Sequence, residues 1–509
     1  MVGFLFFIAY SLIFCFFIYK YKGLNSVFFK PYLFVCLFLF KLLIGVGLIF
    51  FYQSNYNQRE TSDVFKYFDD SKKLNEIAYI SPSSYLKLLV SDDTGDIKAK
   101  NHLDLLKNWK NKTEEHIKFT KNKGNDLFNS QRTIIRLNSL FHFVSFNNIY
   151  IHTLFMCLIG FIGQVLLFKS FIVFNKDRRF ELLIAIFLVP SIAIWSSGLL
   201  KESIIFFALG LFVYNFLNRN SLVNILLVLL SLLLLVFSKF YIALILCFAL
   251  FLYFTSYLLY KNKLSAIGLL LFSAIVLILF NNKAFETIAS KMNNESNIGR
   301  GGYFLSDNIN SKNDIYIDYN DFNNAYPGLN LNDSIVLKKG IKYYTYNDGK
   351  INLSSPLINN NENRSYYLLL FYYPAGSFID LPELDASFKS FLMFFPYALK
   401  NAFLEPLCFS NNSKLYLLFF IENIMVLLVL ALGFLFLDYS KNKKVILFNL
   451  SFAFALLLLI GYTTPIIGNI VRYKAPAITF LLITIALFYN RNLLLNKYKQ
   501  FTCVFYKKK

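Results

Sequence analysis

Long apolar runs are the feature that most limits how this chain can fold. A single soluble core stops growing near about 250–300 residues, whereas this chain has 509 residues and is 56% hydrophobic. About 20 apolar residues cross a bilayer as a helix, and about eleven such runs are present. They occupy 2–19, 31–52, 149–172, 182–197, 200–217, 221–237, 240–259, 264–281, 414–437, 445–463 and 474–489. The sequence therefore predicts an all-α polytopic membrane protein with about 11 transmembrane helices.

The basic residues predict how this protein is oriented. The net charge is +21, and Lys and Arg gather in the short segments between alternate spans. These segments are 20–30, 169–179, 219, 261–263, 441–444 and the tail 491–509. Short loops rich in Lys and Arg stay in the cytoplasm, which predicts an N-terminus outside and a cytoplasmic C-terminus. The charge thus indicates membrane orientation, and we expect membrane lipid but no nucleic acid as a partner.

This orientation divides the chain into membrane and extracytoplasmic parts. Two long polar segments lie outside, and in the second the alternating runs and an "NDG" turn signal predict a compact β-rich unit over about 300–385. An amphipathic stretch, "SFKSFLMFFPYALKNAFLEPL", then predicts a helix at the outer interface. The parts are 1–52 (first two transmembrane helices), 53–148 (first extracytoplasmic loop domain), 149–281 (transmembrane helices three to eight), 282–412 (β-rich insert and interfacial helix), 413–489 (transmembrane helices nine to eleven) and 490–509 (basic cytoplasmic tail).

Polar residues that could act chemically gather at the predicted outer ends of the spans. Cations there can hold phosphate oxygens, and a carboxylate can accept a proton from a hydroxyl. The candidate cations are Lys201, Lys239, Arg132, Arg136, Arg472 and Lys474, and the candidate carboxylates are Asp63, Asp69 and Asp70. Each has a simpler interpretation: "WSSGLLKES" could be only a hairpin anchored by its Trp, and Asp69–Asp70 a solvated pair that caps a helix.

Two charges, Lys41 and Glu422, fall deep inside predicted spans. Buried intramembrane charges are costly unless they pair or face a cavity, so we expect an ion pair that acts either as a tether or as a relay. The four histidines have no zinc-ligand spacing, and "GRGGYF" at 299–304 is not a nucleotide fingerprint. The sequence therefore predicts no protein-bound metal cluster and no nucleotide, and leaves a divalent cation open as a cofactor.

Several stretches together resemble a known class of proteins. "DVFKYFDDS", "RLNSLFHFVSF", "PSIAIWSSGLLKE" and "GYTTPIIGNIVRYKAPAITFLL" are similar to parts of polytopic bacterial envelope-polysaccharide proteins, namely GT-C-type glycosyltransferases and, more loosely, O-antigen polymerases. The resemblance implies a bacterial inner-membrane enzyme that moves a sugar from a polyprenyl-linked donor to a glycan acceptor at the periplasmic face. It implies Asp63, or else Asp69 or Asp70, as the base, and Arg472 as the contact to carrier phosphate.

Two other functions remain open on the sequence. A polysaccharide polymerase would use the same kind of outer basic groove, and a transporter or flippase of lipid-linked glycans would need a polar path through the bundle. The predicted spans are nearly free of charge apart from Lys41 and Glu422, which favours an enzyme.

Overall fold

The computed structural model shows a mostly helical protein with a small antiparallel sheet. Seven helices within the described residues are long and apolar enough to cross a membrane. They are α1 (Val2–Lys20), α2 (Pro31–Asn55), α7 (Ile149–Ile172), α11 (Leu222–Lys261), α16 (Lys414–Leu435), α17 (Lys443–Thr463) and α18 (Ile467–Phe488). The structure describes residues 2–21, 30–55, 59, 62–109, 130–261, 282–306, 314–327, 335–347, 350–353, 355–360, 365–385, 387–406, 414–438 and 442–490. The expected span 264–281 lies outside them.

Two of the expected spans take a different form. The run 182–197 is not one helix: α8 (Arg179–Leu183) passes through a π-helical turn, Ile184–Leu188, before α9 (Pro190–Trp195) begins. Pro190 explains the break, because a residue before proline avoids the helical region, and Val189 is extended at φ −64° and ψ 125°. The run 200–217 forms α10 (Lys201–Leu217), which has 17 residues.

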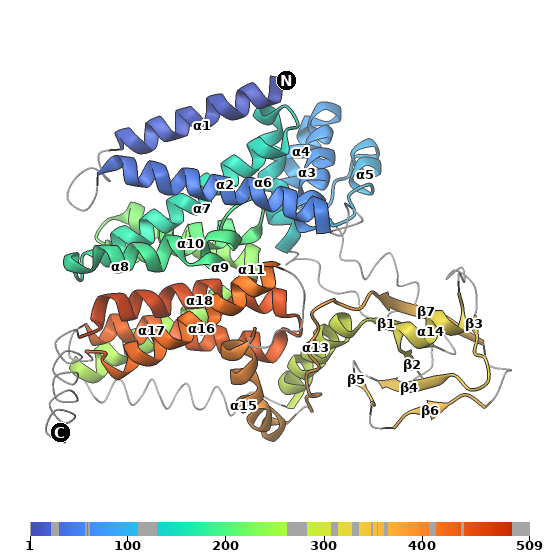
Figure 1. The fold of residues 1–509 in the computed structure, drawn as a ribbon. Helices are drawn as coiled ribbons and strands as arrows, with labels where there is room; N and C mark the ends of the chain where they lie inside the picture. The colour runs from blue at the N-terminus through green and yellow to red at the C-terminus, as the bar shows by residue number, and fades with distance from the viewer. Residues whose placement is uncertain are drawn as a thin grey trace, which may run out of the picture.

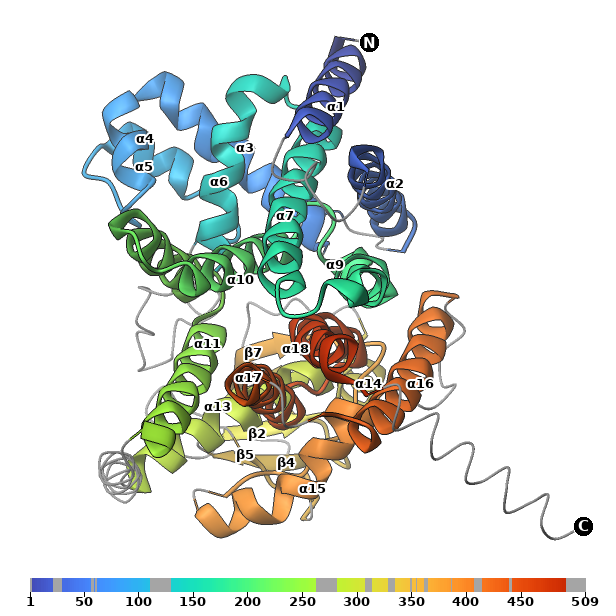
Figure 2. The same cartoon turned by 90° about the vertical axis from the view of Figure 1, so that its left-hand side faces the viewer.

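The expected spans 221–237 and 240–259 are joined in α11. This helix is 40 residues long and is interrupted at Lys239, whose φ of −152° and ψ of 91° are not helical. A straight helix of that length would measure about 60 Å, twice the hydrocarbon thickness of a bilayer. The break redirects the chain, and Figure 2 shows the two halves of α11 running in different directions.

The last helix begins earlier than expected. The sequence predicted a Pro- and Gly-broken linker before a span at 474–489, but α18 starts at Ile467 and continues through Pro476. Arg472 and Lys474 therefore lie on this helix. Figure 2 shows α18 between α9 and α17, and most of its side chains are buried.

A helical domain lies at one end of the bundle. It contains α3 (Asp63–Ile80), α4 (Pro82–Leu88), α5 (Ile97–Leu103) and α6 (Ser130–Ser145), and α3 packs along α6. The beginning of α1 lies at this same end (Figure 1), where Phe6 stacks on Phe146 with ring centroids 4.3 Å apart. Apolar residues of α3 to α6 form one core with residues of α2, α7 and α18, so the domain and the bundle are packed together.

The insert contains the sheet, on the same side as α3 to α6 (Figure 1). After α13 (Asn282–Arg300), Gly301 and Gly302 have φ of 76° and 114°, a region that favours glycine. The strand order is β3-β7-β1-β2-β4-β5, with β6 also paired to β4, and all pairs are antiparallel. The strands are β1 (Gly302–Ser306), β2 (Asp314–Ile317), β3 (Ile335–Val336), β4 (Lys342–Asn347), β5 (Lys350–Ile351), β6 (Leu357–Ile358) and β7 (Ser365–Tyr372).

Two helices belong to the insert region beside the sheet. The short α14 (Tyr319–Ala325) covers β1, and Phe322 stacks on Tyr303 with centroids 3.8 Å apart. The amphipathic stretch forms α15 (Phe388–Leu404), which packs on α17. Its opposite face exposes Phe388, Leu392 and Met393, a pattern typical of a helix at a membrane interface.

Candidate functional site

Six charged side chains from four distant segments meet where the helical domain joins the bundle. The segments are the first turn of α3, the first turn of α10, the break in α11 and the second turn of α18. We call this group the Arg472 cluster. It consists of Asp63, Lys66, Lys201, Glu202, Lys239 and Arg472.

Arg472 lies at the centre and bridges two carboxylates. Its Nη1 contacts Asp63 Oδ2, and its Nη2 lies 2.7 Å from Glu202 Oε2. The guanidinium also lies over the Trp195 ring, 5.7 Å from the centroid. Only 7% of the Arg472 side chain and 1% of the Glu202 side chain are exposed. Two separate carboxylates thus use the planar fork of one buried arginine, an arrangement that a lysine cannot reproduce.

Lys239 reaches the cluster because α11 breaks at this residue. Its Nζ lies 3.2 Å from Glu202 Oε1 and 3.2 Å from the centroid of the Tyr473 ring. The side chain is 10% exposed. A cation buried among apolar helices needs a carboxylate or an aromatic face to replace its hydration, and here Lys239 has both.

The α3 side of the cluster is partly open to solvent. Asp63 is 23% exposed and contacts Lys66, one turn further along α3, as well as Arg472. Burial alone would raise the pKa of Asp63, but the charges of Arg472 and Lys66 outweigh it and keep that pKa well below its usual range. Lys201 donates to Ser130 Oγ at 2.8 Å and lies over the Tyr67 ring.

Polar atoms around the cluster are buried without a hydrogen-bond partner among the described residues. They are Ser62 Oγ, Trp195 Nε1, Ser238 Oγ and Arg472 Nε. Each belongs to a residue that is at most 7% exposed. Buried donors are nearly always satisfied in folded proteins, by protein groups or by ordered water, so these four atoms have hydrogen-bonding capacity that the described side chains do not use.

The charges of the cluster do not balance. Four cations face two carboxylates, which leaves a formal surplus of two positive charges. A buried surplus of this kind attracts an anion, and phosphate oxygens are common partners of arginine and lysine. The arrangement can therefore bind a phosphate or diphosphate group beside a carboxylate that can accept a proton.

The other two candidate aspartates have structural contacts. Asp69 pairs with Arg59 at 2.8 Å on the surface. Asp70 is 2% exposed and accepts hydrogen bonds from the backbone N–H of Lys107 and from the backbone and side chain of Asn108. It therefore fastens α3 to the segment after α5, and of the three aspartates only Asp63 reaches Arg472.

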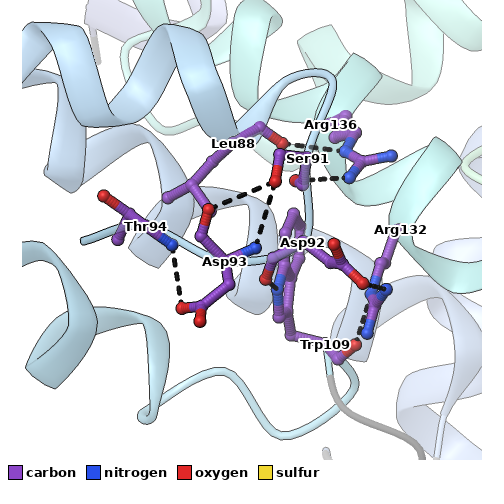
Figure 3. A network of polar contacts seen from close by, with 8 residues as sticks. All are labelled: Leu88, Ser91, Asp92, Asp93, Thr94, Trp109, Arg132 and Arg136. Carbon is purple, nitrogen blue, oxygen red and sulfur yellow. Dashed lines mark hydrogen bonds and ion pairs between the residues drawn. The ribbon is translucent and has the colours of Figure 1, made fainter. Parts of the chain in front are cut away.

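Arg132 and Arg136 also lie outside the Arg472 cluster. Figure 3 shows both on α6, where they face the loop after α4. Arg132 donates to Trp109 O at 2.7 Å and to Asp92 Oδ2 at 3.0 Å. Arg136 donates to the carbonyl oxygens of Leu88 and Ser91 at 2.9 and 2.7 Å. These contacts close the loop onto α6, so both arginines are occupied by the fold of the helical domain.

Lys474 points to a different part of the bundle, although it is only two residues after Arg472. Its Nζ donates to Glu405 O at 2.6 Å and to Asn423 Oδ1 at 2.7 Å. A step of two residues rotates a side chain by about 200° around a helix, which explains why the two cations face opposite sides of α18.

Lys41 and Glu422 have separate partners. Lys41 Nζ donates to Gln164 Oε1 at 3.0 Å and to Ser196 Oγ at 2.5 Å. Glu422 accepts from the backbone N–H of Ser191 at 2.7 Å and from its hydroxyl. The expected ion pair is thus replaced by two sets of contacts, which attach α2 and α16 to the segment that carries α9.

Sequence reasoning assigned no role to Glu202 and Lys66. Glu202 was visible as a carboxylate at the start of an apolar helix, next to Lys201, and Lys66 lies one helical turn after Asp63. A charge at either position is compatible with a solvated helix end, so only the contact with Arg472 identifies Glu202. No group of three His, Cys, Asp or Glu side chains in the described ranges could hold a metal ion.

Comparison of the chain with protein-family models, with curated proteins and with solved structures found no match.

Proposed function

We propose that this protein is a membrane glycosyltransferase that moves a sugar from a polyprenyl-linked donor to a glycan acceptor at the periplasmic face. The observation that supports this most is the Arg472 cluster, in which a carboxylate lies beside buried cations with a surplus of two positive charges. An anion such as the carrier phosphate would restore the charge balance. The helices around it supply the lipid-facing setting that a polyprenyl chain needs.

In this proposal the residues of the cluster divide the reaction between them. The acceptor hydroxyl attacks the anomeric carbon, and Asp63 takes the hydroxyl proton as general base. The bond between that carbon and the phosphate oxygen breaks, so the carrier leaves with the electron pair as polyprenyl phosphate or diphosphate. Arg472 and Lys239 stabilise the charge that grows on this leaving oxygen, which is commonly the largest single contribution to catalysis.

The proposed orientation places the cluster on the outside of the inner membrane. The beginning of α1 lies at the same end as α3 to α6 (Figure 1), and the basic short segments predict that the opposite end is cytoplasmic. Because Lys239 contacts Glu202 at the start of α10, the break in α11 lies at the cluster end as well. The two halves of α11 would then cross the membrane separately, as the eleven-span prediction requires.

The test is to replace cluster residues and measure glycan extension in cells. Arg472→Ala should lower extension about a hundred- to a thousandfold, the usual effect of removing one donor to a developing oxyanion. Arg472→Lys should restore it only in part, because a point charge cannot contact Asp63 and Glu202 together. Asp63→Asn should be equally inactive. Because removing a partner from this buried ion-pair cluster also lowers stability, extension is expressed per amount of folded protein in the membrane, measured for each variant by size-exclusion chromatography.

Asp69→Asn is the matched control, because Asp69 lies on the same helix in an exposed ion pair. It should keep full activity. Normal extension by Arg472→Ala and Asp63→Asn would contradict the proposal. In the transporter alternative, purified protein in vesicles would move lipid-linked glycan across the bilayer without forming a glycosidic bond.

A further inference from the structure

A groove on the lipid-facing side of the bundle lies between α1 and α7, away from the Arg472 cluster. Its volume is about 560 Å³. The side chains that line it are apolar along most of its length, with polar groups only at one end. They are Phe14, Phe17, Ile18, Lys20, Tyr21, Leu158, Phe161, Ile162, Val165, Leu166 and Lys169.

The length of the groove matches one leaflet of a bilayer. On α7 the lining runs from Leu158 to Lys169, and eleven helical steps correspond to about 16 Å. The hydrocarbon core of a membrane is about 30 Å thick, so the groove covers about half of it. The side open to lipid is bounded by exposed side chains, including Phe17 at 64% and Ile162 at 39%.

Both cations of the groove lie at the same end. Lys20 is the last residue of α1, and Lys169 lies in the last turn of α7. Lys169 Nζ lies over two tyrosine rings, Tyr21 and Tyr214, at 5.4 Å from each centroid. The lining residues that the structure describes include neither Asp nor Glu. The end of the groove thus has two positive charges and no carboxylate among the described lining residues, and the rest of the groove is apolar. This arrangement complements a lipid with an anionic head group and an acyl chain.

We propose that this groove binds one anionic glycerophospholipid of the cytoplasmic leaflet. One acyl chain lies between α1 and α7, and the lipid phosphate contacts Lys20 and Lys169. Basic pockets between transmembrane helices on the cytoplasmic side bind anionic head groups in this way. The assignment to the cytoplasmic leaflet follows from the orientation proposed above, in which α1 and α7 both run inward.

A role for Lys169 in setting the membrane orientation of the protein does not by itself explain the position of its side chain. Lysines that only follow the positive-inside tendency extend along their helix and place the ammonium in water. Lys169 is half-buried and lies against two aromatic rings, which fixes its charge at the mouth of the groove. Apolar side chains such as Phe17 and Ile162 are exposed beside the groove, and an acyl chain would cover their surface.

The test measures the lipid retained by the full-length protein. The protein is placed in nanodiscs of phosphatidylcholine with a minor fraction of phosphatidylglycerol, and bound lipid is counted by native mass spectrometry after extraction. The wild type should retain phosphatidylglycerol in preference to phosphatidylcholine. Each lysine near an anionic surface contributes about fivefold, so Lys20→Gln should weaken retention about fivefold, and Lys20→Gln with Lys169→Gln about thirtyfold.

Two further variants separate the groove from general surface charge. Ile162→Trp fills the groove from its exposed side without changing charge, and it should also lower retention. Lys176→Gln removes an exposed charge a few residues beyond α7 and should leave retention unchanged. Equal retention of the two lipids by the wild type, or an equal loss in Lys176→Gln, would overturn the proposal. Displacement of phosphatidylglycerol by an equal amount of polyprenyl phosphate would also overturn it, because the groove would then belong to the carrier.

Discussion

Replacement of Glu202 by Gln is the most direct test of the electrostatics of the Arg472 cluster. Gln has the same shape but no charge, so the change leaves Arg472 and Lys239 without the carboxylate that lies 2.7 and 3.2 Å from them. Removing one partner from a buried ion pair costs about 3–5 kcal/mol. Arg472 still contacts Asp63, and Lys239 still lies over Tyr473, so we expect a loss near the lower limit, about 3 kcal/mol.

The free energy of unfolding of the wild type and of Glu202→Gln can be measured in detergent micelles from their urea transitions. The chain has two Trp residues, and Trp195 lies under the Arg472 guanidinium, so its fluorescence reports on the cluster. A change in midpoint at constant slope measures the change in stability. Glu202→Gln with a stability within about 0.5 kcal/mol of the wild type, the range of ordinary surface changes, would refute this account.

A double-mutant cycle with Lys239→Met gives the matched control. Lys239→Met in the wild-type background should destabilise, because it leaves Glu202 with only Arg472. In the Glu202→Gln background the same change removes an unpaired buried cation. The double variant should therefore be at least about 1 kcal/mol more stable than the sum of the single effects predicts. Simple additivity would mean that the two side chains do not interact.

Two further predictions concern the scaffold around the site. Gly210→Leu should lower the free energy of unfolding by about 3 kcal/mol, because a Cβ at this position would meet the Gly163 carbonyl where α10 crosses α7. Gly47→Ala is the control and should be neutral, because a Cβ there meets nothing within 4 Å. A folded yield of Gly210→Leu equal to that of the wild type in size-exclusion chromatography would contradict this prediction. Burial lowers the pKa of His142 from 6.5 to about 4, so below pH about 6.5 the unfolded chain binds more protons than the folded chain. The free energy of unfolding should therefore fall by about 2 kcal/mol between pH about 6.5 and about 5. His142→Asn should remove this part of the pH dependence of stability, and an unchanged pH dependence would count against a buried neutral His142.

The apolar runs predicted a mostly helical membrane protein, and seven helices within the described residues are long and apolar enough to cross a bilayer. The orientation inferred from the basic flanks stays a prediction. Periodicity and length identify apolar helices because lipid requires both, and β-branched and aromatic alternation identified the sheet. The break at Lys239 falls between the expected spans 221–237 and 240–259, so the sequence located this boundary. Two features required three-dimensional information. The start of α18 at Ile467 places Gly468 inside a helix, and the contact of Lys239 with Glu202 depends on packing that no local pattern shows.

The choice among the three aspartates also needed the structure. Asp63 and Asp70 are seven residues apart on α3, which places them on the same helix face about 10 Å apart along the axis. The resemblance implied Asp63 before Asp69 or Asp70, but no pattern in the residues connects Asp63 with Arg472, which is 409 residues away. Only the position of the first turn of α3 against α18 separates them. The sequence thus offered candidate carboxylates and cations, whereas their pairing is a property of tertiary packing.

The ion pairs of Asp63 have a consequence for the proposed reaction. With Arg472 and Lys66 beside it, the pKa of Asp63 lies well below its usual range after burial has been overcome, and a carboxylate in that state is a weak base. A phosphate that binds Arg472 competes for the same guanidinium, and its negative charge raises the pKa of the neighbouring carboxyl. In the proposed glycosyltransferase, donor binding would therefore make Asp63 a stronger base at the step that needs it.

Asp63 contributes to stability above its unfolded pKa of about 3.9, and that contribution is lost as pH falls through the lower folded value. The stability difference between the wild type and Asp63→Asn should thus stay constant from pH about 7 to about 4 and shrink below that range. Because bound polyprenyl phosphate raises the folded pKa of Asp63, it should make the total loss smaller and complete it at a higher pH. A total loss that the carrier leaves unchanged would separate phosphate binding from Asp63 and remove the reason to assign it the role of base.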